Sequence, residues 1–280
     1  MADTGTLYLV GTPIGNLGDV SERALATLRA VDLVACEDTR RTRVLLDRHG
    51  IAARVTALPA FDEARRAGGI VERLRAGEDV ALVTDAGMPG VSDPGAELVR
   101  LTVEAGIPVV PIPGPTAAIA ALAASGLPTD RFTFYGFLPR KGGARRQALE
   151  ELRAAPGTLI LYESPRRLRE TLLDLRDALG DRRACVAREI TKVHETFVRG
   201  RLSELAERFA GEVLGEVTLV VEGRSGQPPA EAAGDPDAML RERLEAGASV
   251  RDAAREVADA LGLPRKAVYQ RALELHGKRS

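Results

Sequence analysis

Short apolar runs alternate with amphipathic stretches along the first 115 residues. Runs of four or five apolar residues bounded by turn residues are typical of buried strands, and apolar positions three or four apart are typical of helices. The pattern predicts strands at 6–10, 33–36, 55–58, 80–84 and 109–112, and helices from Ser21 and near 40–48, 69–76 and 96–105. Ser21 is the expected N-cap of the first helix. This alternation predicts a mostly parallel sheet covered by helices.

The pattern changes after the Pro- and Gly-rich stretch at 111–115. An Ala-rich helix is predicted at 116–125. The pattern then predicts strands at 132–135, 158–162, 184–187, 196–199 and 217–222, and helices at 145–154, 166–179 and 202–209. Several of these strands follow one another closely, so a second α/β domain with a mixed sheet is expected. The predicted domains are 1–115 and 116–225.

A polar stretch rich in Pro, Gly and Ala at 225–235 is typical of a linker, and a small helical domain is predicted at 236–280. It comprises a helix near 239–245, a helix with apolar positions spaced along 250–261, and a third helix after Gly262 with Pro264 at its first turn. Three short helices resemble a helix-turn-helix, which would contact nucleic acid through Arg265, Lys266 and Arg271. A docking or dimerisation appendage explains the same pattern equally well.

Composition narrows the class of protein. The 280 residues contain no apolar run long enough to span a membrane, and the strand pattern begins within the first ten residues, so a cytoplasmic protein without a signal segment is expected. Cys36 and Cys185 are each in an apolar stretch and are expected to be buried thiols. The three histidines do not cluster, so no metal site is expected.

Charge is distributed unevenly along a nearly neutral chain. Residues 1–130 carry 12 basic and 17 acidic side chains, whereas residues 131–200 carry 15 basic and 9 acidic ones. A basic middle third is consistent with one face that binds a polyanion. The basic residues are 35 arginines and four lysines, a bias that genome composition also explains, so residue type alone identifies no phosphate ligand.

Three loops rich in Gly and Pro follow predicted parallel strands, at 11–19, 84–95 and 113–117. Open α/β sheets bind ligands beyond the carboxyl ends of their strands, where Gly and Pro let a ligand approach the main chain. The glycine spacing fits neither a dinucleotide fingerprint nor a P-loop. Each loop alone is explained by a tight turn, but three at one end of a sheet indicate a site for a nucleoside-like ligand.

Several long motifs carry a family resemblance, among them TLYLVGTPIGNLGDVSERAL, ACEDTRRTRVLL, ALVTDAGMPGVSDPG, PIPGPTAAIAAL, FYGFLPRK, LYESPRRL and AREITK. From about Leu7 to Gly223 the chain resembles the ribosomal RNA small subunit methyltransferase I family, of the tetrapyrrole-methylase fold superfamily, and RKAVYQRALE resembles the family's C-terminal tail. The resemblance implies two α/β domains of the tetrapyrrole-methylase type, S-adenosylmethionine as methyl donor and a homodimer. It implies methylation of the 2′-hydroxyl of a cytidine, cytidine 1402, in the decoding region of 16S rRNA in the 30S subunit.

The resemblance also places a donor pocket on this sequence. It implies donor contacts from Pro13, Asp85, Ala86, Gly87, Met88, Pro89, Val91, Ser92, Thr116, Ala117, Tyr162 and Ile190. Asp85 is alternatively a turn-forming residue, and Met88 and Val91 are alternatively core residues.

Polar groups that directly follow apolar strands are the acceptor-side candidates, because packing alone explains them poorly. The catalytic candidates are Asp38, Glu189 and Lys192, with Glu37 and Thr39 beside the first of them. The RNA-binding candidates are Arg40, Arg41, Arg140, Lys141, Arg145 and Arg146, the last four interpreted as a flexible basic loop suited to phosphates. A surface ion pair of Glu189 with Lys192 and a merely solvated loop are the alternatives.

One segment departs from the family pattern: Pro59-Ala60-Phe61-Asp62-Glu63 stands where relatives carry His and Asn before the acidic residue. Two other functions also remain open. The first is methylation of a tetrapyrrole by the same fold, and the second is a non-enzymatic RNA-binding role in ribosome assembly. Binding of S-adenosylmethionine separates the last of these from both methyltransferases.

Overall fold

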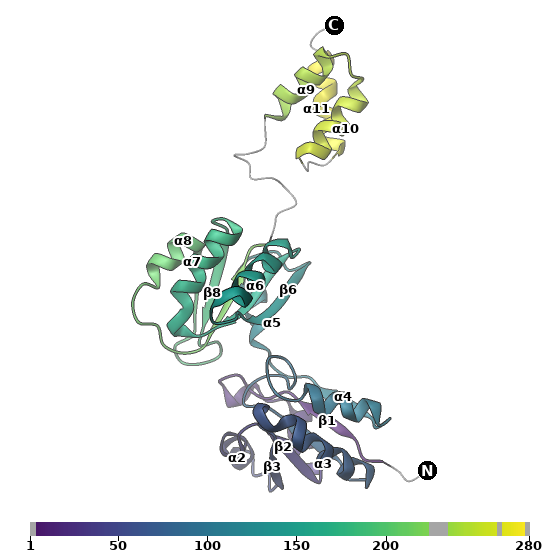
Figure 1. Cartoon of the computed structure of the whole chain (residues 1–280), viewed down its shortest axis with the longest axis vertical. Coiled ribbons are helices and arrows are strands. Elements are labelled where there is room, and N and C mark those ends of the chain that lie inside the picture. The colour runs from purple at the N-terminus through teal and green to yellow at the C-terminus, as the bar shows by residue number, and fades with distance from the viewer. Residues whose placement is uncertain (1–3, 224–234, 262–264, 278–280) are drawn as a thin grey trace. The chain divides into compact units, whose positions relative to one another are not determined.

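The computed structural model describes residues 4–223, 235–261 and 265–277, and these divide into two compact units. The first unit runs to Arg153 and resumes from Thr158 to Glu222. The second comprises Ala154–Gly157 and the chain beyond Glu222. The first unit contains both sheets, and the second contains the C-terminal helices (Figure 1).

The N-terminal sheet is parallel throughout, as the sequence predicts, with the strand order β3-β2-β4-β1-β5. Its strands are β1 (Leu7–Val10), β2 (Leu33–Cys36), β3 (Val55–Ala57), β4 (Val80–Val83) and β5 (Val109–Ile112). The crossover helices are α1 (Glu22–Ala30), α2 (Thr39–Arg48), α3 (Glu63–Arg75) and α4 (Ala96–Glu104). Ser21 caps α1 by accepting a hydrogen bond from the Ala24 amide, as expected.

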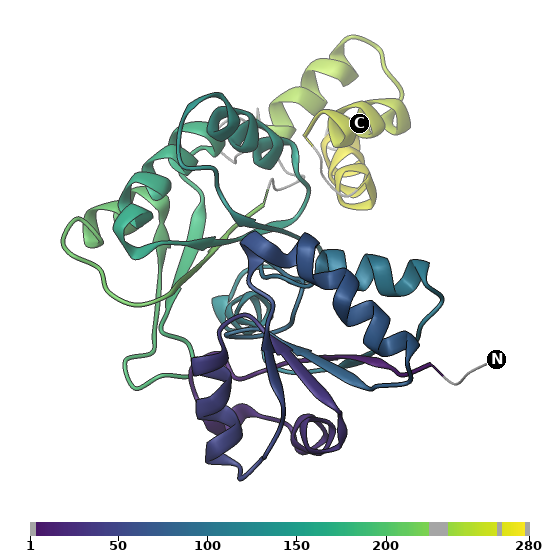
Figure 2. The same cartoon turned by 60° about the horizontal axis from the view of Figure 1, so that its bottom comes forward.

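Helices cover both faces of this sheet (Figure 2) because alternate strand residues point to opposite sides. Leu33 and Ala35 of β2 join a core with α3 and α4, whereas Val34 and Cys36 join a core with α1 and α2. The prediction of a helix beginning near residue 69 is wrong: α3 begins at Glu63. Its apolar face at Ala67, Ile70, Val71 and Leu74 packs into the core, and this burial carries the helix through Gly68 and Gly69.

Part of the Phe61-Asp62-Glu63 segment, which departs from the family pattern, has a structural role. Ala60–Asp62 forms a short 3-10 helix in which the Phe61 side chain is 92% exposed. The Glu63 carboxylate accepts hydrogen bonds from the amides of Glu97 and Leu98, at 2.9 and 3.1 Å. A carboxylate at the first turn of α4 satisfies otherwise free amides and opposes the helix dipole, so Glu63 joins α3 to α4.

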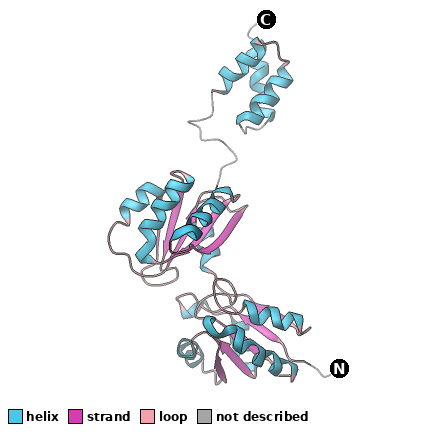
Figure 3. Cartoon of the chain, in the orientation of Figure 1, coloured by secondary structure: helices cyan, strands magenta, loops and turns pink. Residues whose placement is uncertain are grey.

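The second sheet is mixed, also as predicted, with the order β6-β7-β10-β8-β9. Figure 3 distinguishes the strands (magenta) from the helices (cyan). Its strands are β6 (Phe132–Phe137), β7 (Thr158–Glu163), β8 (Arg183–Arg188), β9 (Thr196–Arg201) and β10 (Val217–Val221). The helices are α5 (Ala117–Ser125), α6 (Gly142–Ala154), α7 (Leu168–Leu179) and α8 (Leu202–Arg208). Strands β6 and β7 pair in parallel and the other pairs are antiparallel, so β6, β7 and β8 all end at the same edge.

Both cysteines are buried free thiols, as expected. Cys185 belongs to the core between α5 and the second sheet, with Ala121, Leu122, Ile160 and Val220.

The second unit is a helical cluster of α9 (Pro236–Glu245), α10 (Val250–Leu261) and α11 (Arg265–Gly277). Buried Leu240, Ala253, Val257 and Val268 form its core. The predicted Gly262 and Pro264 and nearly all of the predicted linker at 225–235 lie outside the described residues. The predicted boundaries between domains stay predictions.

Candidate donor cavity and acceptor-side residues

The three Gly- and Pro-rich loops after β1, β4 and β5 meet, as the sequence predicts. The amide of Thr12 donates to the carbonyl of Gly87 at 2.9 Å, and the Gly87 amide donates to the Thr12 carbonyl at 3.1 Å. Gly11 packs on Gly114, where an added Cβ at either position would approach backbone atoms within 2.8 Å. This close approach explains why the first and third loops carry glycine where they touch.

Beside these loops lies a cavity of about 510 Å³, within the range of small-molecule sites in proteins. One part of its wall comes from the loops after β1, β4 and β5 and the start of α5, and the other from the edge of the second sheet. The lining residues are Ile14, Ala86, Gly87, Met88, Val91, Ser92, Asp93, Thr116, Ala117, Ala118, Ile119, Phe132, Phe134, Phe137, Tyr162, Glu163, Ser164, Pro165, Ile190, Gly215, Glu216, Val217 and Thr218. Tyr162 makes an edge-to-face contact with Phe134, with ring centroids 5.0 Å apart, and lies 5.6 Å from Phe137. The cavity therefore has an aromatic wall beside the Gly-rich loops.

Most residues assigned to the donor by resemblance line this cavity. They are Ala86, Gly87, Met88, Val91, Ser92, Thr116, Ala117, Tyr162 and Ile190. Pro13 and Asp85 instead line a separate cavity of about 70 Å³, and Pro89 is buried outside the walls of both. Contact of any of these twelve residues with a donor stays a prediction.

Thr116 shows why the third loop faces the cavity. Its hydroxyl accepts a hydrogen bond from the Ile119 amide and so caps α5. This cap starts α5 directly after the loop and holds Ala117 and Ala118 on the cavity wall.

Sequence reasoning missed 14 of the 23 residues that line this cavity, among them the aromatic residues Phe132, Phe134 and Phe137. Two further examples are residues 215–218 and Asp93. Residues 215–218 carry no motif, and the antiparallel pairing of Val217 with Glu163 brings them to the cavity. Asp93 was identifiable, because it follows Ser92 within the second loop. Burial, and then the carboxylates of Glu37 and Asp85, raise the pKa of Asp93 to about 6.

Asp38 begins α2 rather than facing the cavity. Its carboxylate accepts a hydrogen bond from the Arg40 amide at 2.8 Å and pairs with the Arg40 guanidinium at 2.6 Å. This hydrogen bonding to Arg40 lowers the pKa of Asp38 to about 2. Arg41 pairs with Asp85 at 3.3 Å, so both predicted RNA ligands of this helix face carboxylates of the chain.

Glu189 and Lys192 do form the ion pair that the sequence left as an alternative, at 2.8 Å, and the ammonium also bonds Glu216 at 3.0 Å. Glu189 has a left-handed backbone, with φ 53°, and its carboxylate packs so closely on Gly215 that an added Cβ there would overlap it. Burial acts to lower the pKa of Lys192, but the hydrogen bonds to Glu189 and Glu216 outweigh it and raise the pKa. Lys192 is therefore a cation joined to a residue of the cavity wall.

The predicted flexible basic loop is wrong for Arg145. Helix α6 already begins at Gly142, and the Arg145 side chain is buried inside the domain, where it pairs with Asp174. Arg145 cannot reach an RNA phosphate from this position. Arg140, Lys141 and Arg146 are exposed, as a contact with RNA requires.

Of the three RNA-binding candidates in the C-terminal helices, the structure describes the side chain of one, Arg271. The Arg271 guanidinium donates to both carboxylate oxygens of Asp237, at 2.9 and 2.6 Å, and so ties α11 to α9. The side chains of Arg265 and Lys266 lie outside what the structure describes. The alternatives for these helices, RNA contact or docking, stay open.

Within the described ranges, His, Cys, Asp and Glu side chains form no group of three that would hold a metal ion. Nor does any helix in that part of the chain have the length and apolar character needed to cross a membrane.

Comparisons with known proteins agree with this geometry. The family model "Tetrapyrrole (Corrin/Porphyrin) Methylases" matches residues 6–206, and "RsmI C-terminal HTH domain" matches residues 230–276. Uroporphyrin-III C-methyltransferase from Thermus thermophilus, complexed with S-adenosyl homocysteine, shares the fold. Its TM-score is 0.57 at 22% identity, over 77% of this chain and 97% of that one.

Similarity to curated relatives extends over nearly the whole chain. Ribosomal RNA small subunit methyltransferase I of Mesorhizobium japonicum is 48% identical over 270 residues, which is 96% of this chain and 92% of the relative. The protein of that name from Escherichia coli O157:H7 is 46% identical over 280 residues, 98% of this chain and 96% of the relative. The chain therefore belongs to the ribosomal RNA small subunit methyltransferase I family, within the tetrapyrrole methylases.

Proposed function

We propose that this protein transfers a methyl group from S-adenosylmethionine to the 2′-hydroxyl of a cytidine ribose in 16S rRNA, at cytidine 1402. The observation that carries the proposal is the cavity at the meeting point of the three loops, on which nine of the residues assigned to the donor lie. Family membership supports the donor and the RNA substrate.

The cavity fits the donor in size and chemistry. Its volume of about 510 Å³ suits a nucleoside with an amino-acid tail. The Phe134, Phe137 and Tyr162 rings provide an apolar wall for a base, and Ser92, Asp93 and Thr116 are polar residues of the same wall. When bound, S-adenosylmethionine supplies an activated methyl group on a sulfonium. The chain's task is then to position the ribose oxygen in line with that group and to help its proton leave.

Asp93 is the proton acceptor that the geometry favours. It lies on the cavity wall, and its pKa of about 6 leaves it ionised at neutral pH but basic enough to take a proton. Asp38, whose pKa is about 2, is a weak acceptor and serves to begin α2. Lys192, held by Glu189, offers a positive charge near the cavity wall that suits a ribose or phosphate oxygen.

We expect exposed cationic side chains to make the contacts with RNA. Arg140 and Lys141 follow Phe137 of the cavity wall by a few residues, and Arg146 is exposed on α6. Cations next to the donor cavity suit the phosphates that flank a target ribose. By family resemblance, the protein acts as a cytoplasmic homodimer on the 30S subunit, and light scattering of the purified protein tests the dimer.

The test is transfer of labelled methyl from S-adenosylmethionine to 30S subunits that lack the modification, followed by mapping of the modified nucleotide. We expect label on the 2′-oxygen of cytidine 1402. Label on a base, or on a porphyrinoid but not on RNA, would refute the proposal, as would calorimetry that detects no binding of S-adenosylmethionine.

A further inference from the structure

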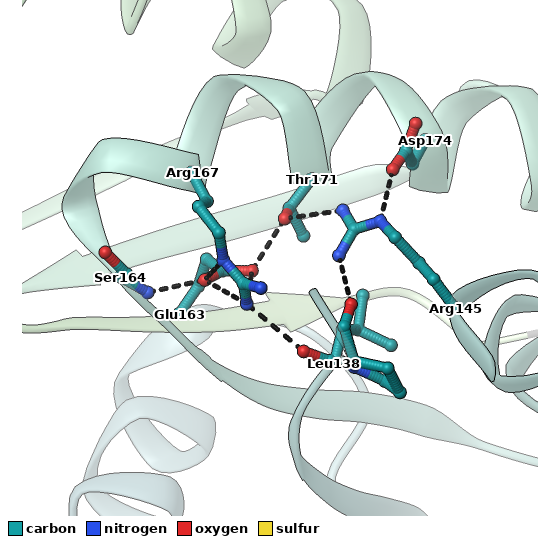
Figure 4. A network of polar contacts seen from close by, with 8 residues as sticks. Leu138, Arg145, Glu163, Ser164, Arg167, Thr171 and Asp174 are labelled. Atoms are coloured by element: carbon teal, nitrogen blue, oxygen red, sulfur yellow. Dashed lines mark hydrogen bonds and ion pairs between the residues drawn. The ribbon is translucent and has the colours of Figure 1, made fainter. Parts of the chain in front are cut away.

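A buried network of charged side chains lies at the end of β7 (Figure 4), and its central residue, Glu163, also lines the cavity. At its centre is Glu163, whose side chain is 1% exposed. Its carboxylate accepts hydrogen bonds from the Ser164 amide and the Thr171 hydroxyl, each at 2.6 Å, and from the Arg167 guanidinium at 2.7 Å. Each of these hydrogen bonds to the Glu163 carboxylate comes from the end of β7 or from the first turns of the helical segment that follows it.

Arg145 enters the network from α6. Its guanidinium donates to Asp174 at 2.7 Å and to the Thr171 hydroxyl at 3.0 Å. Two guanidinium groups thus face two carboxylates, and the network is neutral as a whole. Buried ion pairs of this kind are retained only where hydrogen bonds satisfy both partners, as they do here.

The two arginines also hold the backbone of a different segment. Arg167 donates to the carbonyl of Leu138 at 3.2 Å, and Arg145 donates to the carbonyl of Pro139 at 3.0 Å. We call Leu138–Pro139 the strap, because it joins two functional parts of the chain. Phe137, before it, lines the cavity, and the exposed Arg140 and Lys141 follow it.

The strap fixes how far these cations are from the cavity. Three residue steps separate Phe137 from Arg140, a reach of about 11 Å at most. Within that limit the direction of the chain is free unless something holds it, and both strap carbonyls are held by the network. The position of Arg140 and Lys141 therefore depends on Arg145 and Arg167.

We infer that Arg145 is a positioning residue for RNA: it acts through the Pro139 carbonyl to hold Arg140 and Lys141 near Phe137 of the cavity wall. The inference rests on the proposed function, in which these cations contact RNA. It replaces direct contact by Arg145 with an indirect role. A guanidinium suits this role because its fixed fork serves three acceptors in different directions at once, which an ammonium on a flexible chain does not.

The test variant is Arg145→Lys, which keeps the buried positive charge opposite Asp174 but loses the fork. Lysine keeps the positive charge nearby, so we count the lost guanidinium bond to the strap as one ordinary protein hydrogen bond, which corresponds to about a 3- to 10-fold change in an equilibrium. We expect the KM for 30S subunits to rise by about that factor. The dissociation constant for S-adenosylmethionine should change less than about twofold, because Arg145 does not line the cavity.

Thr171→Val is the matched control. It removes the hydroxyl that links Arg145 to Glu163 but leaves both bonds to the strap carbonyls. We expect a lower melting temperature with the KM for 30S subunits unchanged. If Thr171→Val raises this KM as much as Arg145→Lys does, a general loss of stability explains both, and the inference is overturned.

A second measurement does not depend on methyl transfer. Trypsin cleaves after Arg140 and Lys141, and a loosened strap presents these bonds more often. We expect limited proteolysis at this segment to be about 3- to 10-fold faster in Arg145→Lys than in the wild type or Thr171→Val, by the same loss of one hydrogen bond. Equal cleavage rates in all three proteins overturn the inference, whereas a wild type that methylates no 30S subunit overturns the proposed function and leaves this readout intact.

Discussion

Replacement of Glu163 by Gln tests whether the network in Figure 4 stabilises the fold from within. The amide keeps the shape of the side chain but removes its charge and presents a donor toward groups that already donate. Arg167 then faces no full negative charge, and its side chain is only 21% exposed. Breaking a buried ion pair typically costs about 3 to 5 kcal/mol. Partial access of water to Arg167 places the expected loss near the lower end, about 3 kcal/mol.

That loss corresponds to a fall in melting temperature of roughly 6 to 12 °C, because domains of this size lose about 2 to 4 °C for each kcal/mol. The assay is thermal unfolding followed by circular dichroism, with urea unfolding as a check on the free energy.

The matched control is Glu78→Gln. Glu78 pairs with Arg73 at 2.9 Å, but both side chains are 35% exposed. Water competes for such a pair, and its loss should cost less than about 1 kcal/mol. Equal melting shifts for the two variants would show that burial adds nothing to the Glu163 pair and would refute the reasoning.

The remaining predictions concern the cavity and the RNA. Tyr162→Leu should weaken S-adenosylmethionine binding about 2- to 10-fold in calorimetry through loss of the aromatic wall, while Tyr135→Leu, away from the cavity, should not. Methyl transfer by the wild type should be fastest above pH 6 and fall about tenfold per pH unit below it, because Asp93 accepts a proton only when ionised. Asp93→Asn should be slower by about 10²-fold or more and lack this dependence; an unchanged pH profile contradicts the role of Asp93. Arg146→Ala should weaken RNA binding and reduce its salt dependence by about one ion, whereas Arg153→Ala, paired with Glu150, should do less; equal effects would argue against a local contact.

The loops that line the candidate donor cavity were predictable from sequence, for a physical reason. Parallel strands end at one edge, so loops that follow β1, β4 and β5 must lie near one another, and their Gly and Pro residues identify them. Residues 215–218 were not identified, because they carry no sequence motif. Antiparallel pairing with β7 brings them to the cavity.

The acceptor side was less predictable because the environment of a charged side chain depends on distant residues. Arg145 resembles its exposed neighbour Arg146 in sequence, yet its carboxylate partner, Asp174, is 29 positions away. The pKa of Asp93 likewise depends on burial and on carboxylates at positions 37 and 85. Local pattern identifies neither partner.

The charge balance of the buried network affects how a salt titration of RNA binding is interpreted. Residues 131–200 contain 15 basic side chains, a number that suggests a large electrostatic footprint. Arg145 and Arg167 are already neutralised by Asp174 and Glu163, so they release no condensed counterions from RNA when it binds. The slope of RNA affinity against salt concentration therefore reflects the exposed cations of this stretch, and not its total number of basic residues. A shallow slope is thus compatible with a specific RNA complex, because part of the basic composition belongs to the interior architecture.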